Sequence, residues 1–313
     1  MGNWFKTTLL LGAMTALIVF IGQLFGGRHG MIIAFVVALG MIFFSYWFSD
    51  KVVLSMYRAR EIGPADTSGI YNIVGELALA ADLPMPRIYI IPQDSPNAFA
   101  TGRDPAHSVI AITEGLLKIM DKEELKGVIA HEMAHIKNRD ILIGSIAATM
   151  ASTIMIFANI AKWNIIFGSG FGDNEEDGGG IGFMGLIVIS ILAPLAAMII
   201  QMAISRSREY LADATGTRFT GNPDGLADAL EKLRTYTKRV PLHANPSTAH
   251  MFIVNPLSAD YMMNLFSTHP PLEQRIAKLR RKTPVSRPFD TQKSRGEKEA
   301  KAFWRHISSQ PKK

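Results

Sequence analysis

The chain has 313 residues, of which 48% are hydrophobic and only 19% are charged, and its mean hydropathy is positive at +0.15. This composition favours a membrane protein over a fully soluble one. The formal net charge of +6 is spread along the chain without a recognisable nucleic-acid-binding module, so we do not expect DNA or RNA to be a partner. The chain contains no cysteine, so its fold needs no disulfide.

Two stretches without charged residues lie near the N-terminus, at 8–25 and 31–48. Each is long enough to cross a hydrocarbon core of ~30 Å as a helix. Only residues 26–30 join them, so the pattern predicts a tight transmembrane hairpin within 1–50. No clear cleavage site follows the first stretch and a second stretch comes at once, so we interpret the first as an uncleaved anchor and not as a signal peptide.

The next segment, 51–140, contains patterns of both helices and strands. It shows helical periodicity, short β-branched runs bounded by turn residues, and a capping box at Asp121 and Glu124. They predict a helix at 70–81, strands at 87–91 and 108–113, and a helix at 121–139. We expect this segment to be the first part of a soluble domain.

The helix at 121–139 carries the pattern H-E-x-x-H at His131, Glu132 and His135. Positions i and i+4 of a helix lie on one face, so the two imidazoles can point to one place, with Glu132 beside them. In this pattern the histidines bind Zn²⁺ and the glutamate is the general base. The alternative is an exposed helix that happens to carry two histidines.

Two further uncharged stretches, 141–161 and 181–204, predict a second transmembrane hairpin within 141–204, although a pair of buried core helices is the alternative. The loop between them is acidic around Asp173. Basic residues instead flank the ends that face the soluble segments: Lys51, Arg58, Arg60, Lys137, Arg139, Arg206 and Arg208. Because Lys and Arg accumulate on the cytoplasmic side, we predict that both termini and the soluble domain are cytoplasmic.

The third metal ligand must come from elsewhere in the chain, because a catalytic zinc site needs three protein ligands. Without cysteine this ligand must be His, Asp or Glu, and the best candidate is Glu209 in a segment with a helical pattern. Asp213 lies on the same face at i+4 and could accept a hydrogen bond from a ligand histidine, which would fix the ring orientation. The alternative is an ordinary amphipathic helix with surface carboxylates.

The segment 205–282 is expected to contain further helices at about 222–237 and 271–281. It must join the segment 51–140, because Glu209 has to reach the histidines. We therefore predict one discontinuous, mainly helical α+β domain of the zincin-like type, with a membrane hairpin inserted in it. The tail at 283–313 is polar and basic, and we expect it to be loosely ordered.

Several motifs together resemble the HtpX family of membrane-bound zinc metalloproteases, which is related to the CAAX prenyl endopeptidases. The first two are H-E-M-A-H at 131–135 and R-E-Y-L-A-D at 208–213. P-N-A-F-A-T-G at 96–102, T-H-P-P at 268–271 and the paired hydrophobic stretches are also similar to that family. The resemblance covers roughly residues 1–282.

The resemblance implies one Zn²⁺ per chain, with His131, His135 and Glu209 as ligands and Glu132 as the base. It also implies that the segment 96–102 is an edge strand on the substrate side. Extended peptides often bind to such an edge through main-chain hydrogen bonds, which makes Asn97 and Ala98 candidates for substrate contacts. The alternative for this segment is a plain loop.

The mechanism that such a site predicts is hydrolysis by activated water. Zn²⁺ lowers the pKa of bound water toward ~7, and Glu132 would take the proton and later deliver it to the leaving amine. A donor must also stabilise the oxyanion. His269, before a Pro-Pro pair, is our candidate unless it only closes a loop, and Arg206 and Arg208 are alternatives. The histidines expected at the surface are His29, His107, His243, His250 and His306.

The leading hypothesis is a zinc endopeptidase of a bacterial inner membrane, with its active site close to the membrane surface. Its partners would be the lipid bilayer and polypeptides, namely membrane or misfolded proteins, a substrate class that only the resemblance implies. A second hypothesis is a prenyl-processing CAAX-type endopeptidase, although four spans leave no obvious intramembrane chamber. A third is a non-enzymatic membrane scaffold or transporter, although the predicted spans lack the charged residues typical of ion pathways. The sequence does not indicate an oligomeric state.

Overall fold

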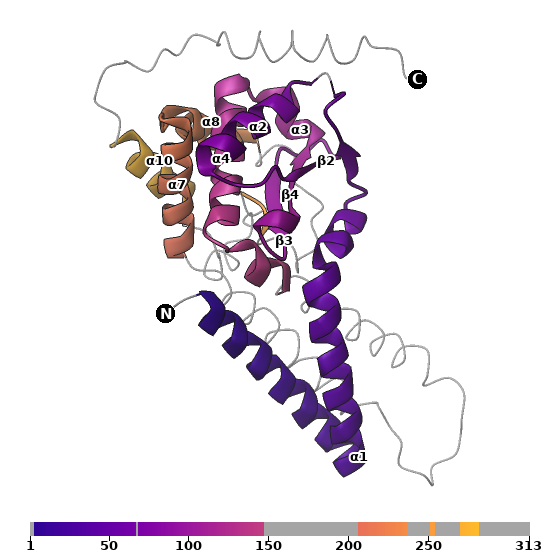
Figure 1. Cartoon of the computed structure of the whole chain (residues 1–313). Helices are drawn as coiled ribbons and strands as arrows, with labels where there is room; N and C mark the ends of the chain where they lie inside the picture. The colour runs from indigo at the N-terminus through magenta and orange to yellow at the C-terminus, as the bar shows by residue number, and fades with distance from the viewer. Residues whose placement is uncertain (1–2, 67, 147–205, 237–250, 254–269, 282–313) are drawn as a thin grey trace, which may run out of the picture.

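A computed structural model of the chain describes residues 3–66, 68–146, 206–236, 251–253 and 270–281. These residues form a long N-terminal helical hairpin and, next to its C-terminal end, a mainly helical α+β domain (Figure 1). The α+β part of the predicted fold class is therefore confirmed. The predicted second membrane hairpin lies outside the described residues except for 141–146, which are helical, and so does the predicted tail.

Helix α1, Asn3–Met56, is interrupted at Gly27, where φ is 54° and ψ is −140°. Glycine adopts such a positive φ without the steric cost that a side chain adds. The two arms diverge from this point as a V (Figure 1). They are close near the break, since a Cβ on Gly22 would lie 2.4 Å from the Cβ of Ala34. The break falls inside the connection that the sequence predicts for the first hairpin.

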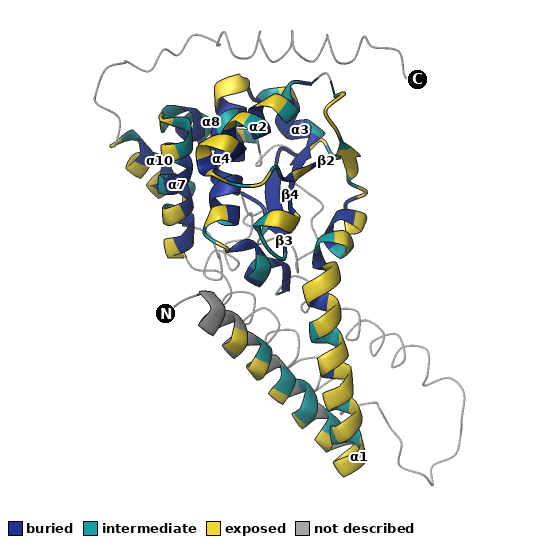
Figure 2. Ribbon diagram, viewed as in Figure 1, coloured by how far each residue is buried: buried dark blue, intermediate teal, exposed yellow. Residues whose placement is uncertain are grey.

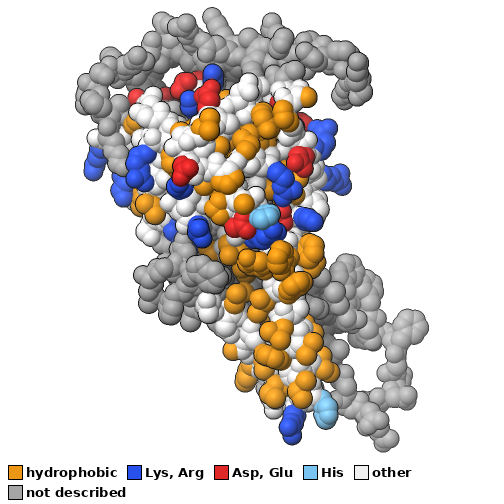
Figure 3. Space-filling model, in the orientation of Figure 1, with side chains coloured by type: hydrophobic (Ala, Val, Ile, Leu, Met, Phe, Trp, Pro, Cys, Tyr) orange, Lys and Arg blue, Asp and Glu red, His pale blue; other side chains and the backbone are white. Residues whose placement is uncertain are grey.

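The second arm of α1 exposes large apolar side chains. Ile33, Val36 and Phe43 are 64%, 62% and 63% exposed, as the yellow ribbon of Figure 2 and the apolar surface of Figure 3 show for this arm. Within the described part of the chain, Gly26–Met56 is the one helical segment found long and apolar enough to cross a membrane, with a mean hydropathy of 2.3. A helix that is apolar on all sides and not buried in protein suits a lipid environment.

A four-stranded sheet in the order β1-β2-β4-β3 forms the centre of the domain. Its strands are β1 (Arg60–Ile62), β2 (Arg87–Ile91), β3 (Ala98–Gly102) and β4 (Ser108–Thr113). The bounds of β2 and β4 agree with the prediction, and the two strands are parallel, with Arg87 opposite Val109. β3 is antiparallel to β4, with Ala98 opposite Ile112. It therefore occupies an edge of the sheet, whereas β1 at the other edge was not predicted.

Helices surround this sheet: α2 (Ile70–Ala81), η1 (Pro105–His107), α3 (Glu114–Ile119), α4 (Lys122–Lys137), α7 (Arg206–Thr220), α8 (Asp224–Tyr236) and α10 (Leu272–Arg280). α2 has the predicted bounds, and α4, α8 and α10 end within two residues of theirs. Both α7 and α8 pack against α4, and α10 packs against α8 (Figure 1). The two soluble segments therefore share one hydrophobic core, drawn in dark blue in Figure 2.

A smaller aromatic cluster joins the end of α1 to the sheet. Tyr57 follows α1, Phe99 lies in β3 and Phe252 comes from the short segment 251–253. The ring of Phe252 makes edge contacts with both of the other rings at centroid distances of 5.3 Å. Aromatic pairs at this separation contribute about 0.5–1.5 kcal/mol beyond their buried area. This cluster holds the segment 251–253 against β3.

Candidate metal centre

Helix α4 begins with the capping box that the sequence predicts. Asp121 and Glu124 each accept a hydrogen bond from the main-chain N–H of the other at 2.9 Å. The side of α4 that carries the motif faces the protein interior, because His131 and Glu132 are only 1% and 2% exposed and His135 is half-buried. This burial excludes the alternative of an exposed helix that carries two histidines by chance.

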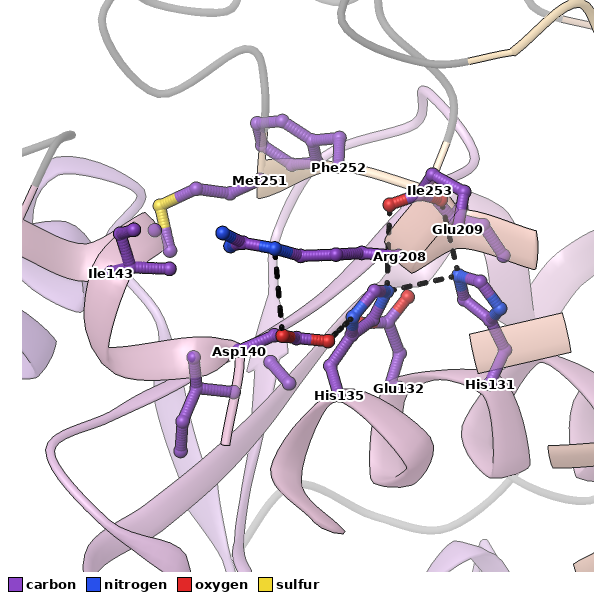
Figure 4. Close-up of a pocket in the computed structure, with 13 residues that line it drawn as sticks. His131, Glu132, His135, Asp140, Ile143, Arg208, Glu209, Met251, Phe252 and Ile253 are labelled. Atoms are coloured by element: carbon purple, nitrogen blue, oxygen red, sulfur yellow. Dashed lines mark hydrogen bonds and ion pairs between the residues drawn. The ribbon is translucent and has the colours of Figure 1, made fainter. Parts of the chain in front are cut away.

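The structure brings the three predicted metal ligands to one point (Figure 4). The Nε2 atoms of His131 and His135 lie 3.3 Å apart, and each lies 3.6 Å from a carboxylate oxygen of Glu209. A tetrahedral ion with bonds of ~2.0–2.1 Å separates its ligand atoms by about 3.3–3.4 Å. Two imidazole nitrogens and one carboxylate at these separations can hold a single metal ion.

Helix α7 supplies Glu209 from the second soluble segment. Glu209 and Asp213 are both buried, as is Gly216 three residues further on. A Cβ on Gly216 would lie 2.9 Å from the carbonyl oxygen of Ala130 and 3.0 Å from the main-chain nitrogen of His131. Only a residue without a side chain allows the two helices to come this close. Gly216 therefore sets how near the carboxylate of Glu209 comes to the motif.

A buried network supports His131. Its Nδ1 atom lies 3.0 Å from the carboxylate of Asp213, as the sequence predicts, and Arg275 of α10 donates two hydrogen bonds to the same carboxylate at 2.7 and 3.0 Å. Burial opposes ionisation of Asp213, but Arg275 and His131 outweigh it and lower the pKa of Asp213 to about 2. Burial and the charge of Arg275 also oppose protonation of His131, but hydrogen bonds to Asp213 and Glu209 raise its pKa to about 9. These carboxylates favour positive charge in the site.

The support of His135 is more open. Its Nδ1 atom lies 3.3 Å from the carboxylate of Asp140, and the other oxygen of Asp140 lies 3.8 Å from Nε of Arg208. Arg208 is buried, with 8% exposed, and within the described part of the chain its Nε and Nη2 atoms have no hydrogen-bond partner. Burial lowers the pKa of this guanidinium, which Asp140 and Glu209 partly oppose. For both histidines, the Nδ1 atom thus lies near a carboxylate, and that carboxylate lies near an arginine.

A pocket opens onto the three candidate metal ligands and Glu132. Burial raises the pKa of Glu132, the nearby histidines lower it, and Glu209 raises it. A carboxylate whose proton affinity is raised in this way is suited to accept a proton. Residues from α4, the segment 140–144 that follows it, β3, α7 and the segment 251–253 line the pocket: Ala100, His131, Glu132, His135, Asp140, Ile141, Ile143, Gly144, Arg208, Glu209, Met251, Phe252 and Ile253 (Figure 4).

The predicted substrate-contact residues lie at the start of β3, outside the pocket lining. Asn97 is 1% exposed, and its carbonyl oxygen accepts a hydrogen bond from the main-chain N–H of Thr113 at 3.0 Å. Ala98 receives a hydrogen bond from Ile253 N–H at 3.1 Å, and its own N–H donates to the side chain of Asn97 at 3.1 Å. The residue of β3 that does line the pocket is Ala100.

The three predicted oxyanion donors have different locations. His269 lies outside the described residues. Arg206, the first residue of α7, is exposed and is not part of the pocket lining. Arg208 is part of that lining, on the His135 side (Figure 4).

Sequence reasoning did not identify Asp140 and Arg275 as residues of the site. Asp140 lies three residues after the end of the motif helix, and its position five residues after His135 is the only signal that could have suggested it. Arg275 is one of several charged residues in α10, yet it is fully buried. Nothing in the local pattern distinguishes it from its exposed neighbours.

Comparisons with known proteins identify the family of the chain. The model of peptidase family M48 matches residues 64–283, which include all the ligand candidates. A protein named "Protease HtpX homolog" from Desulforapulum autotrophicum is 60% identical over 97% of this chain and 99% of its own length. A protein of the same name from Pyrococcus furiosus is 54% identical over 90% of this chain and 96% of its own. The crystal structure of S. mikatae Ste24p is similar with a TM-score of 0.47 and 19% identity, over 88% of this chain and 66% of that chain.

Proposed function

The chain belongs to peptidase family M48 and is a metalloprotease, and from this premise we propose that it is a membrane-embedded endopeptidase that depends on one Zn²⁺. The single observation that carries the proposal is the meeting of His131, His135 and Glu209 around one point beside the buried Glu132. The apolar second arm of α1 supports the proposal that the enzyme is embedded in a membrane.

We assign the metal as zinc from the donor set. Imidazole nitrogen and carboxylate oxygen without thiolate are the ligands of many catalytic zinc sites, and such sites use three protein ligands. His131, His135 and Glu209 would hold the ion. When bound, Zn²⁺ would polarise the scissile carbonyl and lower the pKa of water.

The residues of the chain would then perform the proton transfers. Glu132 would accept a proton from the attacking water and return it to the leaving amine, a role that its burial between the histidines supports. Asp213 and Asp140 would hold the Nδ1–H groups of His131 and His135, which leaves both Nε2 atoms directed at the ion. His269 is still our candidate for the oxyanion donor.

We propose that the polypeptide substrate lies extended along the edge of β3. At the start of this edge Ala98 already bonds to Ile253, so we assign the pairing with a substrate to the pocket residue Ala100, two positions further along the strand. Asn97 would contribute by shaping the strand, since its side chain accepts from Ala98 N–H. Main-chain pairing of this kind tolerates many sequences and suits an enzyme that cleaves membrane or misfolded proteins in quality control.

We also propose a multi-pass topology in the bacterial inner membrane, with the catalytic domain and both termini in the cytoplasm. The basic residues that flank the predicted spans support this orientation. A reporter fused after Lys313 or inserted near Arg60 should report the cytoplasm, and one inserted near Asp173 should report the opposite side. A cytoplasmic signal near Asp173 would mean that the second predicted hairpin does not span the membrane.

The proposed activity can be tested directly. The protein is purified in detergent with a chelator present, Zn²⁺ is then added, and the digestion of casein is followed by electrophoresis. We expect digestion only after Zn²⁺ is added, and cleavage at internal bonds as judged by mass spectrometry. A prenylated peptide ending in a CAAX sequence serves as a second substrate. Cleavage of that peptide with no digestion of casein would favour the CAAX-type activity instead.

A further inference from the structure

Arg208 is a buried cation, and two of its three donor nitrogens are not used by the described residues. Only 8% of the residue is exposed, and within the described part of the chain neither Nε nor Nη2 has a hydrogen-bond partner. A buried donor without a partner typically costs ~1–3 kcal/mol, and more when it is charged. Such a group in a peptidase pocket is a natural place for a ligand to bind.

The guanidinium lies beside the metal ligands but does not face them. Figure 4 shows that it extends past Asp140 on the His135 side, toward Ile143 and Met251, whereas Glu209 and His131 lie on the other side of His135. Ile143 and Met251 are apolar and line the same pocket. A group bound to Arg208 would therefore lie next to the reacting bond and not on the reacting carbonyl.

The charges around Arg208 distinguish between possible ligands. Asp140 lies 3.8 Å from Nε, which is too far for a hydrogen bond but close enough to compensate the positive charge. Glu209 is the next residue in the chain and adds a second negative charge nearby. A third carboxylate would be repelled by these two, whereas a neutral carbonyl oxygen would not. Nε–H and Nη2–H form one edge of the planar guanidinium and can point at one oxygen together.

We propose that Arg208 is a substrate-binding residue that donates through Nε and Nη2 to a main-chain carbonyl oxygen of the bound polypeptide, next to the scissile bond. Ile143 and Met251 form the apolar wall of this subsite. The proposal rests on the proposed peptidase function, because both place a polypeptide in the same pocket. It assigns to Arg208 a role in ground-state binding instead of oxyanion stabilisation.

The first test measures binding without turnover. A fluorescein-labelled peptide from a casein segment that the enzyme cleaves is titrated into Zn²⁺-loaded protein carrying Glu132→Gln, and fluorescence anisotropy gives the Kd. Adding Arg208→Met should raise the Kd about 10- to 100-fold, because a hydrogen bond to a charged group is lost. The Kd with Arg208→Lys, which keeps the charge but only one donor nitrogen, should lie between the values with Arg208 and with Arg208→Met.

The matched control is Arg218→Met, which changes an exposed arginine of the same helix that bonds to Thr215 outside the pocket lining. It should leave the Kd unchanged. An unchanged Kd in Arg208→Met would overturn the proposal. If the wild-type enzyme digests casein at the same time, only the role of Arg208 fails, and if the wild type is inactive, the proposed peptidase function fails as well.

The second test identifies the acceptor. Single peptide bonds flanking the scissile bond are replaced one at a time by a trans-alkene, which removes the carbonyl oxygen. At one position, the alkene should lower kcat/KM of the wild type by about 10- to 100-fold and that of Arg208→Met by little, because the same hydrogen bond is already absent. Additive losses at every position would contradict the proposal.

Two further outcomes would assign Arg208 to another role. Loss of bound Zn²⁺ from both Arg208→Met and Arg208→Lys, measured by mass spectrometry, would mean that Arg208 only supports Asp140 and His135. A fall confined to kcat, equal for all peptides and without a change in Kd, would mean that it stabilises the oxyanion. A wild-type preference for acidic substrate side chains that Arg208→Met abolishes would mean that the ligand is a carboxylate.

Discussion

The two histidines that we propose as metal ligands come from successive turns of one helix, yet the side chains that support their Nδ1 atoms differ. Behind His131, Asp213 and the fully buried Arg275 form hydrogen bonds of 2.7–3.0 Å. Behind the half-buried His135, the distances are longer, at 3.3 Å to Asp140 and 3.8 Å from there to Arg208. The same combination of histidine, carboxylate and arginine is therefore closed on one side and open toward the pocket on the other.

This difference separates two tasks within one site. Asp213 and Arg275 come from α7 and α10, far from the motif in sequence, so the His131 side ties the metal centre to the folded domain. Arg275 also donates to the carbonyl oxygen of Ile253 at 3.3 Å, which links this side to the segment beside β3. On the His135 side, Asp140 comes from the segment just after α4 and Arg208 comes from α7. Both residues line the pocket, and Nε and Nη2 of Arg208 have no hydrogen-bond partner among the described residues. We infer that the first side provides rigidity and the second contacts the substrate.

The largest effect on metal content and activity is expected at Glu209, which lies near both histidines. Glu209 lies 3.6 Å from both histidines and is the third of the three protein ligands that we propose for the metal. Glu209→Ala should therefore empty the metal site and abolish proteolysis. Metal analysis by mass spectrometry, together with casein digestion, checks this. A variant that retains a full complement of Zn²⁺ would show that the third ligand lies elsewhere, and His269 would then be the next residue to change.

Glu132 should affect activity without affecting the metal. The amide in Glu132→Gln cannot accept a proton, while both imidazoles and Glu209 remain in place. We expect proteolysis to fall by about 100- to 10,000-fold, the range typical of general acid–base catalysis, with normal Zn²⁺ content. Substantial activity in a preparation free of wild-type enzyme would contradict the role of Glu132.

Removing Asp213 or Asp140 in turn tests whether the support of His131 and the support of His135 differ. Asp213→Ala removes the shorter of the two ion pairs of the buried Arg275 and leaves only its 3.5 Å contact with Glu209. Breaking a buried pair typically costs ~3–5 kcal/mol of stability, and the lost support of His131 should weaken metal binding by about 10- to 100-fold. Asp140→Ala should destabilise the protein less, because the contact between Asp140 and Arg208 is already 3.8 Å long. Thermal unfolding and Zn²⁺ titration of both variants measure the difference. Equal losses would remove the distinction between the two sides.

Local patterns were sufficient to predict much of this structure. The bounds of α2, β2 and β4 follow from hydrophobic periodicity, and the capping box fixes the start of α4. The H-E-x-x-H spacing was enough to select His131 and His135, whereas Glu209 was only the best candidate until the resemblance to the HtpX family implied it. In each of these cases the chemistry that determines the structure lies within a few residues of sequence, or within the small set of side chains that bind zinc.

The parts that were missed depend on tertiary contacts. β1 has only three residues, Arg60–Ile62, too few for a period to be visible. Arg275 is buried by elements that pack around α10, and a polar helix gives no sign of which charge will be internal. The position of Ala98 against Ile253 likewise depends on a distant segment that folds onto the strand edge. Sequence patterns report the amphipathic face of an element but not which single polar residue its neighbours enclose.

The smallest expected effect comes from Gly216, where α7 approaches the backbone of α4 at Ala130 and His131. In Gly216→Ala the new methyl group would lie 2.9 Å from Ala130 O and 3.0 Å from His131 N, so the two helices must separate slightly. Overpacking of this kind typically costs ~1–3 kcal/mol. The shift should also weaken Zn²⁺ binding, because Glu209 moves with the helix.

The matched control is Gly75→Ala in α2, where a Cβ meets nothing within 4 Å. In a helix interior this change should stabilise the protein by ~0.5–1 kcal/mol and leave Zn²⁺ affinity unchanged. Urea unfolding and competition with a zinc-binding dye measure both quantities. If Gly216→Ala behaves like Gly75→Ala, the approach of α7 to His131 does not limit the geometry of the site. The buried network of Asp213 and Arg275 would then be sufficient to hold Glu209 in place.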